Sequence, residues 1–440
     1  MGLLQQIAFV LMSGIFIGCF AWSMKSIRRN ILLGRAEDLT DRKPERLRNL
    51  LLQAFGQRKM FRNLWVAILH LVIYVGFFII NLEVLEIVLD GVLGTHRLFM
   101  PLLGPAYPWL IQAFEWLAAG VIVACLFFLA RRNLWPVKRL QSAELDGWPR
   151  KDAHWILIVE ILLMGLFLTM NASDTLLQSR GYGDYAQHTT GSFWVSSWLH
   201  PLLEGLSSTT LAGLERSAWW LHIAGIFAFL NYLPRSKHLH ILLAFPNAWY
   251  VRLSPAGAMS NMSDVQQEVQ YALNPTLAAE AAAAPAVAQR FGAKDVTDLS
   301  WKNLMDAYSC TECGRCTAAC PASQTGKQLS PRRIMMATRD RLEEVGAGIS
   351  RQVSPQEDGK SLLRDYISEE ALRACTTCNA CVTECPVGIS PLDIILQMRR
   401  YLVMEEGSAP SEWTMMFGNV ESSFAPWKIG SEERETWANA

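Results

Sequence analysis

Five apolar stretches, each close to 20 residues long, lie within the first 233 residues of this chain. A helix needs about 20 apolar residues to cross a hydrocarbon core of about 30 Å, so each stretch is long enough for one span. The composition agrees, because the excess of apolar residues and tryptophans lies in this part. We therefore predict a mainly α-helical protein with a five-helix membrane domain over residues 1–245. The predicted spans are 5–24, 63–82, 109–130, 155–172 and 217–233.

The loop charges give the bundle an orientation. The first basic residue, Lys25, follows the first apolar stretch, so this stretch is predicted to be an anchor and not a cleaved signal peptide. Residues 25–62 hold eleven Lys and Arg against four acids, and residues 131–153 hold six against three. Basic loops remain in the cytoplasm, so we expect a multi-pass protein of the cytoplasmic (inner) membrane with its N-terminus outside and its C-terminal part inside. The zero net charge gives no reason to expect a nucleic-acid partner.

Eight of the ten cysteines lie in two runs, CTECGRCTAACP (310–321) and CTTCNACVTECP (375–386), each spaced C-x2-C-x2-C-x3-C-P. In ferredoxins with this spacing, three cysteines of one run and the last cysteine of the other hold one [4Fe–4S] cluster. A zinc ribbon is the alternative, but it needs only paired C-x2-C. The predicted ligands are Cys310, Cys313, Cys316 and Cys385 for the first cluster, and Cys375, Cys378, Cys381 and Cys320 for the second.

Free thiols at this density suit a reducing compartment, in agreement with the loop charges. Helix-start signals at Ser330, Ser368 and Ser390 indicate a helical ferredoxin over residues 299–407. Residues 246–298 are Ala-rich and are predicted to be a linker with one short helix. Residues 408–440 are rich in aromatic side chains and are predicted to be a subunit interface, with packing onto the ferredoxin as the alternative. Cys19 and Cys125, which stand alone in apolar stretches, are interpreted as fillers.

Histidines in and near the spans are candidate ligands for haem b, because ionisable groups within a membrane are costly and usually functional. His70 and His222 are predicted to meet in the outer half of the membrane as axial ligands of one haem. On one continuous helix His240 would share a face with His222 at a distance of about 27 Å, near the inner side. The position expected to partner His240 is Met60, so a second haem remains open, and His238 with His240 could instead line a quinone site or a docking surface for the clusters.

Acidic residues in the spans admit two interpretations. Glu115 and Glu160 could relay protons to a quinone or could pair with buried donors. Four further polar residues are predicted to be solvated loop groups: Glu83, Glu86, His188 and His200.

The membrane part resembles the five-span haem b domain of the respiratory nitrate reductase gamma family. The residues that carry this resemblance are His70, His222 and the stretch LPRSKHLH that ends at His240, within about residues 60–245. The resemblance implies two stacked haems with four histidine ligands, whereas Met60 stands where the fourth histidine is expected.

The remainder resembles the N-terminal half of membrane-bound heterodisulfide-reductase-like iron–sulfur oxidoreductases, including the electron-transfer-flavoprotein:menaquinone type. The resemblance rests on DLSWKNLMDAYSCTECGRCTAACPA, TGKQLSP, CTTCNACVTECPVGI, APW and ERETWA, within residues 291–440. Such proteins usually continue into cysteine-rich C-C-G repeats. The resemblance therefore implies a split protein whose catalytic half is a separate cytoplasmic subunit, with an electron-transfer flavoprotein as a candidate partner.

Together these features predict an electron-transfer subunit of a membrane quinone oxidoreductase. Electrons would pass between a cytoplasmic partner, two [4Fe–4S] clusters, haem b and menaquinone or ubiquinone, in either direction. Two alternatives are a membrane anchor and relay platform without a quinone site, and a redox sensor. No residue pattern for hydrolysis or group transfer is present.

Overall fold

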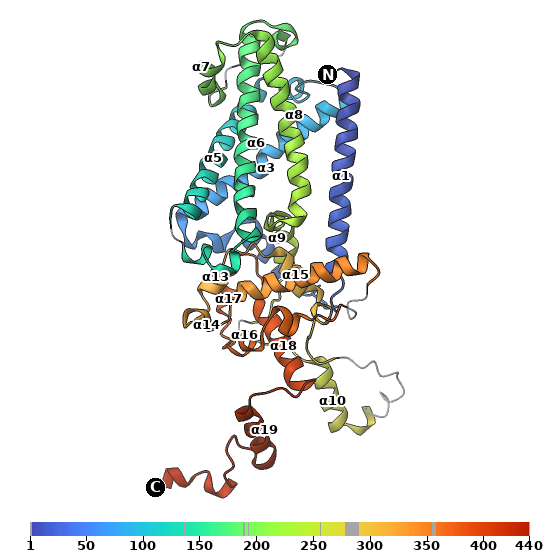
Figure 1. The fold of residues 1–440 in the computed structure, drawn as a ribbon, viewed down its shortest axis with the longest axis vertical. Coiled ribbons are helices and arrows are strands. Elements are labelled where there is room, and N and C mark those ends of the chain that lie inside the picture. Colours follow the sequence, from blue (N-terminus) through green and yellow to red (C-terminus); the bar gives the residue numbers. More distant parts are fainter. Residues whose placement is uncertain are drawn as a thin grey trace.

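The computed structural model is an elongated helical molecule (Figure 1). A bundle of long helices stands over a smaller helical unit, and the N-terminus lies at the end of the bundle away from that unit. The structure describes residues 2–135, 137–187, 190–191, 193–255, 257–277, 290–353 and 358–439. Over these residues there is no β-strand, only two isolated bridges, which agrees with the predicted mainly helical fold.

The bundle consists of α1 (Leu3–Ile31), α3 (Leu64–Leu93), α5 (Tyr107–Asn133), α6 (Trp148–Ser179) and α8 (Ser208–Tyr232). Four helical segments are long and apolar enough to cross a membrane: Leu3–Ile31, Leu64–Leu93, Met100–Asn133 and Trp148–Ser179. The third of these joins α4 (Met100–Leu103) to α5. The fifth predicted span corresponds to α8, which falls outside this group of four but packs along α6 and α1.

The helix that follows the fifth stretch is broken, contrary to the continuous helix considered above. α8 ends at Tyr232, two 3-10 turns follow, and α9 (His240–Trp249) begins only at His240. Pro234 lies in the first of these turns, and proline has no N–H group with which to continue an α-helix. His222 and His240 therefore do not lie on one straight axis.

The lower unit contains the cysteine runs and is built from short helices. Serine side chains cap three of them as predicted, because Ser330, Ser368 and Ser390 each accept a hydrogen bond from a backbone N–H three residues on. The helices are α12 (Trp301–Ser309), α13 (Arg315–Ala318), α14 (Pro321–Gln324), α15 (Pro331–Ser350), α16 (Glu369–Arg373), α17 (Ala380–Glu384) and α18 (Pro391–Met404). α13 and α17, one from each cysteine run, lie side by side.

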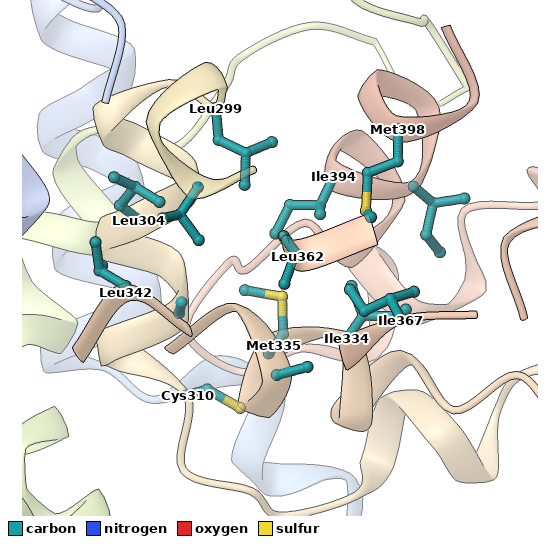
Figure 2. Close-up of a cluster of buried hydrophobic side chains, with 14 of the residues drawn as sticks. Leu299, Leu304, Cys310, Ile334, Met335, Leu342, Leu362, Ile367, Ile394 and Met398 are labelled. Carbon is teal, nitrogen blue, oxygen red and sulfur yellow. The ribbon is translucent and has the colours of Figure 1, made fainter. Parts of the chain in front are cut away.

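A hydrophobic core fills the lower unit (Figure 2). Leu304, Leu362 and Ile394 are completely buried in it. The same core includes Ile27 and Ile31 from the end of α1. The first membrane helix therefore contributes side chains to the core of the ferredoxin unit.

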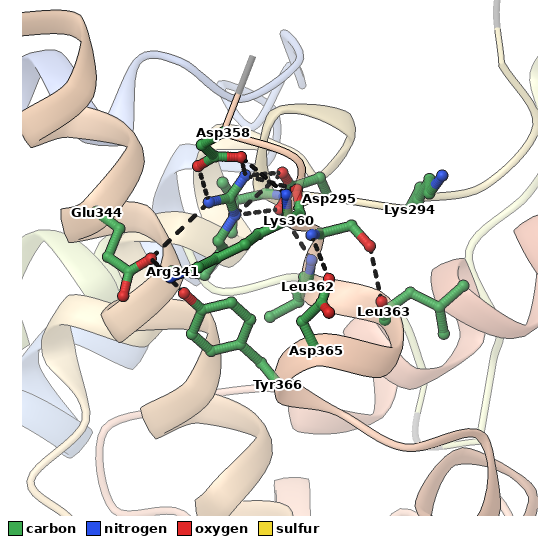
Figure 3. Close-up of polar contacts among 12 residues, drawn as sticks. Lys294, Asp295, Arg341, Glu344, Asp358, Lys360, Leu362, Leu363, Asp365 and Tyr366 are labelled. Carbon is green, nitrogen blue, oxygen red and sulfur yellow. Dashed lines mark hydrogen bonds and ion pairs between the residues drawn. The ribbon is translucent and has the colours of Figure 1, made fainter. Parts of the chain in front are cut away.

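A buried arginine holds the segment between the cysteine runs (Figure 3). The Arg341 guanidinium donates to Asp295 at 2.7 Å and to the Lys360 carbonyl at 2.9 Å, and it forms an ion pair with Asp358. A fully buried guanidinium needs such partners, because its charge is removed from water. These contacts attach the segment that follows α15 to the N-terminal side of the unit.

A polar cluster lies inside the bundle at the end away from the ferredoxin unit. α3 extends to Leu93, so Glu83 and Glu86 are helical and buried, and the prediction of solvated loop groups is wrong for both. Glu86 accepts hydrogen bonds from Tyr107 at 2.9 Å and from the Phe99 N–H at 2.8 Å. The donors come from residues that follow α3, which explains how the helix can bury Glu86. Glu83 Oε2, in contrast, is buried without a hydrogen-bond partner among the described residues.

The two histidines that were also predicted to be solvated loop groups, and the predicted linker, are described next. His200 is partly buried and hydrogen bonds to Thr175 at 3.0 Å, whereas His188 lies outside the described residues. Within its described part the predicted linker contains α10 (Ser263–Leu273), and residues 275–277 are helical as well. Its residues 278–289 also lie outside the description.

The C-terminal tail extends away from the body of the molecule. Its helix, α19 (Ser411–Ser423), has no fully buried residue, and Phe424, Trp427 and Trp437 are 86%, 70% and 80% exposed. Trp413 lies under the Arg373 guanidinium at 5.8 Å from the ring centroid. Trp413 and Phe417 of this helix are exposed as well.

Candidate functional site

One cavity of about 430 Å³ lies where the bundle meets the ferredoxin unit. Its walls come from α3, α5, α6, α8 and α9, and from the loop of the first cysteine run. All four histidines singled out in the sequence line it: His70, His222, His238 and His240. The structure therefore brings together side chains that are up to 170 residues apart in the chain.

Three of these histidines are oriented in the same way. The Nδ1 atom of His70 lies 3.0 Å from Gln57 Oε1, that of His222 lies 2.9 Å from the Leu163 carbonyl, and that of His240 lies 3.0 Å from the Lys237 carbonyl. An oxygen acceptor at Nδ1 keeps the proton on that nitrogen and leaves Nε2 unprotonated. A neutral imidazole with Nε2 free is the form that binds haem iron. These side chains thus fit a haem in the cavity.

His70, His238 and His240 form a group. The rings of His238 and His240 are 5.6 Å apart. Burial lowers the pKa of His238 to about 3, and His240 and His70 contribute to this shift. His222 is not among these contributors. The structure thus groups His70 with the two later histidines.

This grouping corrects the expected depth of His70. α3 begins at Leu64, directly after a turn that touches the ferredoxin unit. In that turn Lys59 Nζ donates to the Cys385 carbonyl at 2.9 Å, and the Lys59 carbonyl accepts from Arg315 at 2.9 Å. His70 is less than two helical turns further on, so it lies in the half of the bundle next to the ferredoxin and not in the opposite half.

Three residues whose role was left open by the sequence now have defined surroundings. Met60 lines the cavity, and its sulfur accepts a hydrogen bond from Arg315 at 3.3 Å. Glu160 also lines the cavity, and its carboxylate is 3.9 Å from His238 Nε2. Glu115, in contrast, is fully buried and accepts from Asn171 and from two backbone N–H groups. For Glu115 the structure agrees with pairing to buried donors.

The cysteines of the two runs converge between α13 and α17. Cys310, Cys313, Cys316 and Cys385, the predicted ligands of the first cluster, line one small cavity together with Cys381. Burial raises the pKa of Cys381 to about 12, and the neighbouring Cys375, Cys320 and Cys378 contribute to this shift. The predicted ligands of the second cluster are therefore also neighbours. This arrangement agrees with the predicted crossover, in which each run completes the cluster of the other.

The two cysteine sets differ in their position relative to the large cavity. Cys313 and Pro386 line the cavity itself. Arg139 donates to the Cys313 carbonyl at 2.7 Å, and Lys59 donates to the Cys385 carbonyl, so two basic membrane-side loops hold the first set. Cys378 of the second set is exposed. The first set thus lies next to the histidines, whereas the second set includes the exposed Cys378, with Cys320 and Cys381 buried.

Sequence reasoning missed the basic side chains of the cavity. These residues counted only as loop charges in the sequence, whereas the structure gathers them on the ferredoxin side of the histidines. The five residues are Arg131, Arg132, Arg139, Lys237 and Arg315. For Arg131 and Arg132, the position in the last turn of a membrane helix is the one sequence signal that could have singled them out.

Comparison with known proteins defines the class of the lower unit first. Residues 295–389 match the family model described as a 4Fe-4S dicluster domain. This match supports iron–sulfur clusters over the zinc alternative.

Individual relatives are iron–sulfur oxidoreductases. The chain is 27% identical to the probable iron–sulfur-binding oxidoreductase FadF of Bacillus subtilis, over 98% of this chain and 60% of the relative. It is 26% identical to the EtfAB:quinone oxidoreductase of Syntrophomonas wolfei, over 90% of this chain and 54% of the relative. A shorter match, 27% identical over 32% of this chain and 35% of the relative, is to a dihydromethanophenazine:CoB–CoM heterodisulfide reductase component of Methanosarcina acetivorans.

These matches define what is established for the chain. It spans less than two thirds of the length of FadF and of the EtfAB:quinone oxidoreductase. No solved structure matches it. The predicted likeness to heterodisulfide-reductase-like iron–sulfur oxidoreductases is confirmed at that level, and an electron-transfer role with 4Fe–4S clusters is supported. The nitrate reductase gamma likeness stays a prediction.

Proposed function

We propose that this chain is an electron-transfer subunit of a membrane quinone oxidoreductase. The observation that carries the proposal is the single cavity between the bundle and the ferredoxin unit, lined both by four histidines and by Cys313. Bound at these residues, two [4Fe–4S] clusters and a haem b would supply one-electron transfers, which side chains cannot perform. A continuous series of redox sites from the exposed second cysteine set into the bundle fits such a subunit.

The protein itself provides spacing and orientation along this route. Cys378 lies at the exposed end, where a soluble partner can approach. The first cysteine set is fixed against the bundle through Arg139 and Lys59, which donate to the carbonyls of Cys313 and Cys385. Two charged anchors on backbone carbonyls limit movement between the ferredoxin unit and the cavity, and a fixed separation favours electron transfer between bound groups.

We propose His70 and His240 as the two residues that would hold a haem b. Both have Nδ1 bound to an oxygen, both line the cavity, and both belong to the group next to the ferredoxin unit. The pair His70 and His222 predicted from the sequence is the alternative. His222 has the same Nδ1 arrangement, so it remains a candidate ligand for a second haem or a hydrogen-bonding residue for a quinone.

A cytoplasmic partner subunit is proposed to dock beside the second cysteine set. The exposed aromatic tail is attached next to that set, because Trp413 packs on Arg373, two residues before Cys375. Exposed aromatic side chains of this density are typical of interfaces. By their names, relatives are subunits of larger complexes or act with an electron-transfer flavoprotein, which supports this proposal.

The proposed location is the cytoplasmic membrane, with the ferredoxin unit inside. The two basic loops that predict the cytoplasmic side, 25–62 and 131–153, both contact the ferredoxin unit, through Lys59 and Arg139 respectively. The two basic loops and the ferredoxin unit therefore lie on one side of the bundle, as the positive-inside rule requires for this orientation.

Quantification of iron and haem on the purified full-length chain tests the proposal. We expect about eight cluster irons per chain and at least one haem b, together with haem oxidation by a quinone analogue. Clusters without haem, or haem that no quinone analogue oxidises, would favour the relay platform without a quinone site. A chain without either cofactor would contradict the proposal altogether.

A further inference from the structure

Two arginines at the end of α5 face the cavity without a partner. Arg131 and Arg132 are partly buried and line the cavity. Within the part of the chain that the structure describes, neither has a hydrogen bond or an ion pair. The other three basic side chains of the cavity are engaged, since Arg139 donates to Cys313, Arg315 to Lys59, and Lys237 to Glu312.

The charges around the cavity do not balance. Glu160 is the only carboxylate among its described lining residues, whereas five lining side chains are cationic. Glu160 lies beside His238, and the nearest acid to Lys237, Glu312, is held by Arg339 as well. Arg132 is also attracted by Asp152 and Glu312, which do not line the cavity. A guanidinium that is partly withdrawn from water gains from a bound anion, because desolvation of a charge is costly. The cavity is therefore complementary to an anionic ligand.

We propose that Arg131 and Arg132 bind the two propionate carboxylates of the haem held by the cavity histidines. This assignment rests on the proposed function. Arginine pairs with carboxylates through two parallel N–H···O bonds, a geometry that lysine cannot provide. Two unpaired guanidinium groups match the two carboxylates of one haem, and they face the same cavity as His70 and His240.

The wall of the cavity has a charged part and an apolar part. The two arginines lie at the end of the bundle where Arg139 holds the Cys313 carbonyl. Phe77, Val84 and Val121 give the cavity an apolar lining. Both parts fit a ligand that combines carboxylates with a large apolar body, as haem does.

A cycle of two proteins and two haems tests the inference. Full-length chain produced without haem is reconstituted in membranes with haem b or with its dimethyl ester, which lacks both carboxylates. In Arg131→Gln/Arg132→Gln we expect haem b to dissociate at least several-fold faster and to have a lower midpoint potential, because cations favour the reduced haem. The ester should behave alike in the variant and in the unsubstituted chain. Arg235→Gln is the control, since Arg235 is exposed at the same end but does not line the cavity.

The outcomes separate this inference from the proposed function. If the variant holds haem b with unchanged dissociation and potential, the propionate assignment is wrong while haem binding stands. The arginines bind lipid phosphate, and the inference fails, in two cases. In the first, the faster dissociation caused by the arginine substitutions adds to that caused by the ester. In the second, the effect of the substitutions depends on the content of anionic lipid in the membrane. If the unsubstituted chain takes up neither haem, the proposed function itself fails.

Discussion

The two ends of the helix bundle both bury charged groups, but they treat them differently. At the far end many polar side chains have a partner within the protein: Arg97 pairs with Asp174, Tyr107 bridges Arg97 and Glu86, and Glu115 accepts three hydrogen bonds. A few buried atoms there, among them Glu83 Oε2, have no partner among the described residues. Around the 430 Å³ cavity, three histidines keep Nε2 free, and two arginines have no hydrogen bond or ion pair with a described residue. A polar group that is satisfied internally supports the fold, whereas one left unsatisfied beside a cavity indicates a ligand.

The largest expected effect concerns the cavity histidines. His70→Ala and His240→Ala should each abolish the b-type haem absorbance of the purified chain, because each removes one proposed axial ligand. His222→Ala separates the two possible pairs: it should retain a haem with His70 and His240 as ligands, but should abolish it if the ligands are His70 and His222. Reduced-minus-oxidised spectra and haem content per chain provide the measurement. Full absorbance in the His70 and His240 variants would remove the proposed site.

The next effect is at the far end and should concern folding only. Arg97→Met leaves Asp174 buried without its partner, which we expect to cost about 3–5 kcal/mol of stability. The measurement is the thermal midpoint in detergent, with haem content per folded chain expected to remain unchanged. The double variant Arg97→Met/Asp174→Asn is the matched control and should regain much of the loss. A variant that loses haem while it keeps its thermal stability would contradict a purely structural far end.

A matched pair of glutamates gives a direct comparison of the two ends. Glu115→Gln places an amide NH₂ among three donors and should lower stability by about 1–3 kcal/mol. Glu160→Gln should change stability by less than about 0.5 kcal/mol, because no described donor binds its carboxylate; its effect should appear in quinone-linked haem oxidation. Equal destabilisation by both substitutions would show that Glu160 is structural as well.

A smaller effect than that of Arg97→Met concerns a satisfied pair at the ferredoxin end. Burial would raise the pKa of Glu37, but Arg252, which donates two hydrogen bonds of 2.7 Å, holds it below the usual value of 4.5. A carboxyl with a depressed pKa stabilises the fold above pH 4.5, and this stability is lost as the pH falls further. Glu37→Gln should therefore cost about 1 kcal/mol at pH 7, and this cost should decrease as the pH falls below 4.5.

Thermal midpoints across this pH range provide the measurement for that variant. Glu45→Gln is the control, because Glu45 is exposed and lies 3.6 Å from Arg42. A difference for Glu37→Gln that does not decrease with acidification would mean that its effect does not come from the ion pair.

Local signals in the sequence predicted the local features of the structure. The serine caps at Ser330, Ser368 and Ser390 depend on neighbouring residues, and all three are present. The apolar stretches also depend on neighbouring residues, and they located the bundle helices. The fifth stretch, however, lies in α8, which is not among the four helical segments that are long and apolar enough to cross a membrane. The ligand assignment of the cysteines stays a prediction, with both sets gathered as it requires.

Features that depend on distant contacts were not predictable from the sequence. Glu86 was predicted to be a solvated loop group, because its donors Phe99 and Tyr107 come from later in the chain. The depth of His70 depends on the contact of the preceding turn with Cys385, more than 300 residues away. Arg131 could be recognised as a candidate binding residue only from the cavity, which four other helices help to enclose.

The hydrophobic core that Ile27 and Ile31 share with the ferredoxin unit has a consequence for biogenesis. The ribosome makes these two side chains near the start of synthesis, but Leu304 and Ile394, which complete the same core, emerge several hundred residues later. The ferredoxin unit can therefore reach its full core only beside a membrane that already holds α1. Insertion of clusters at the cysteines would then follow membrane targeting. A ferredoxin fragment made without α1 would have an incomplete core and would be prone to aggregation.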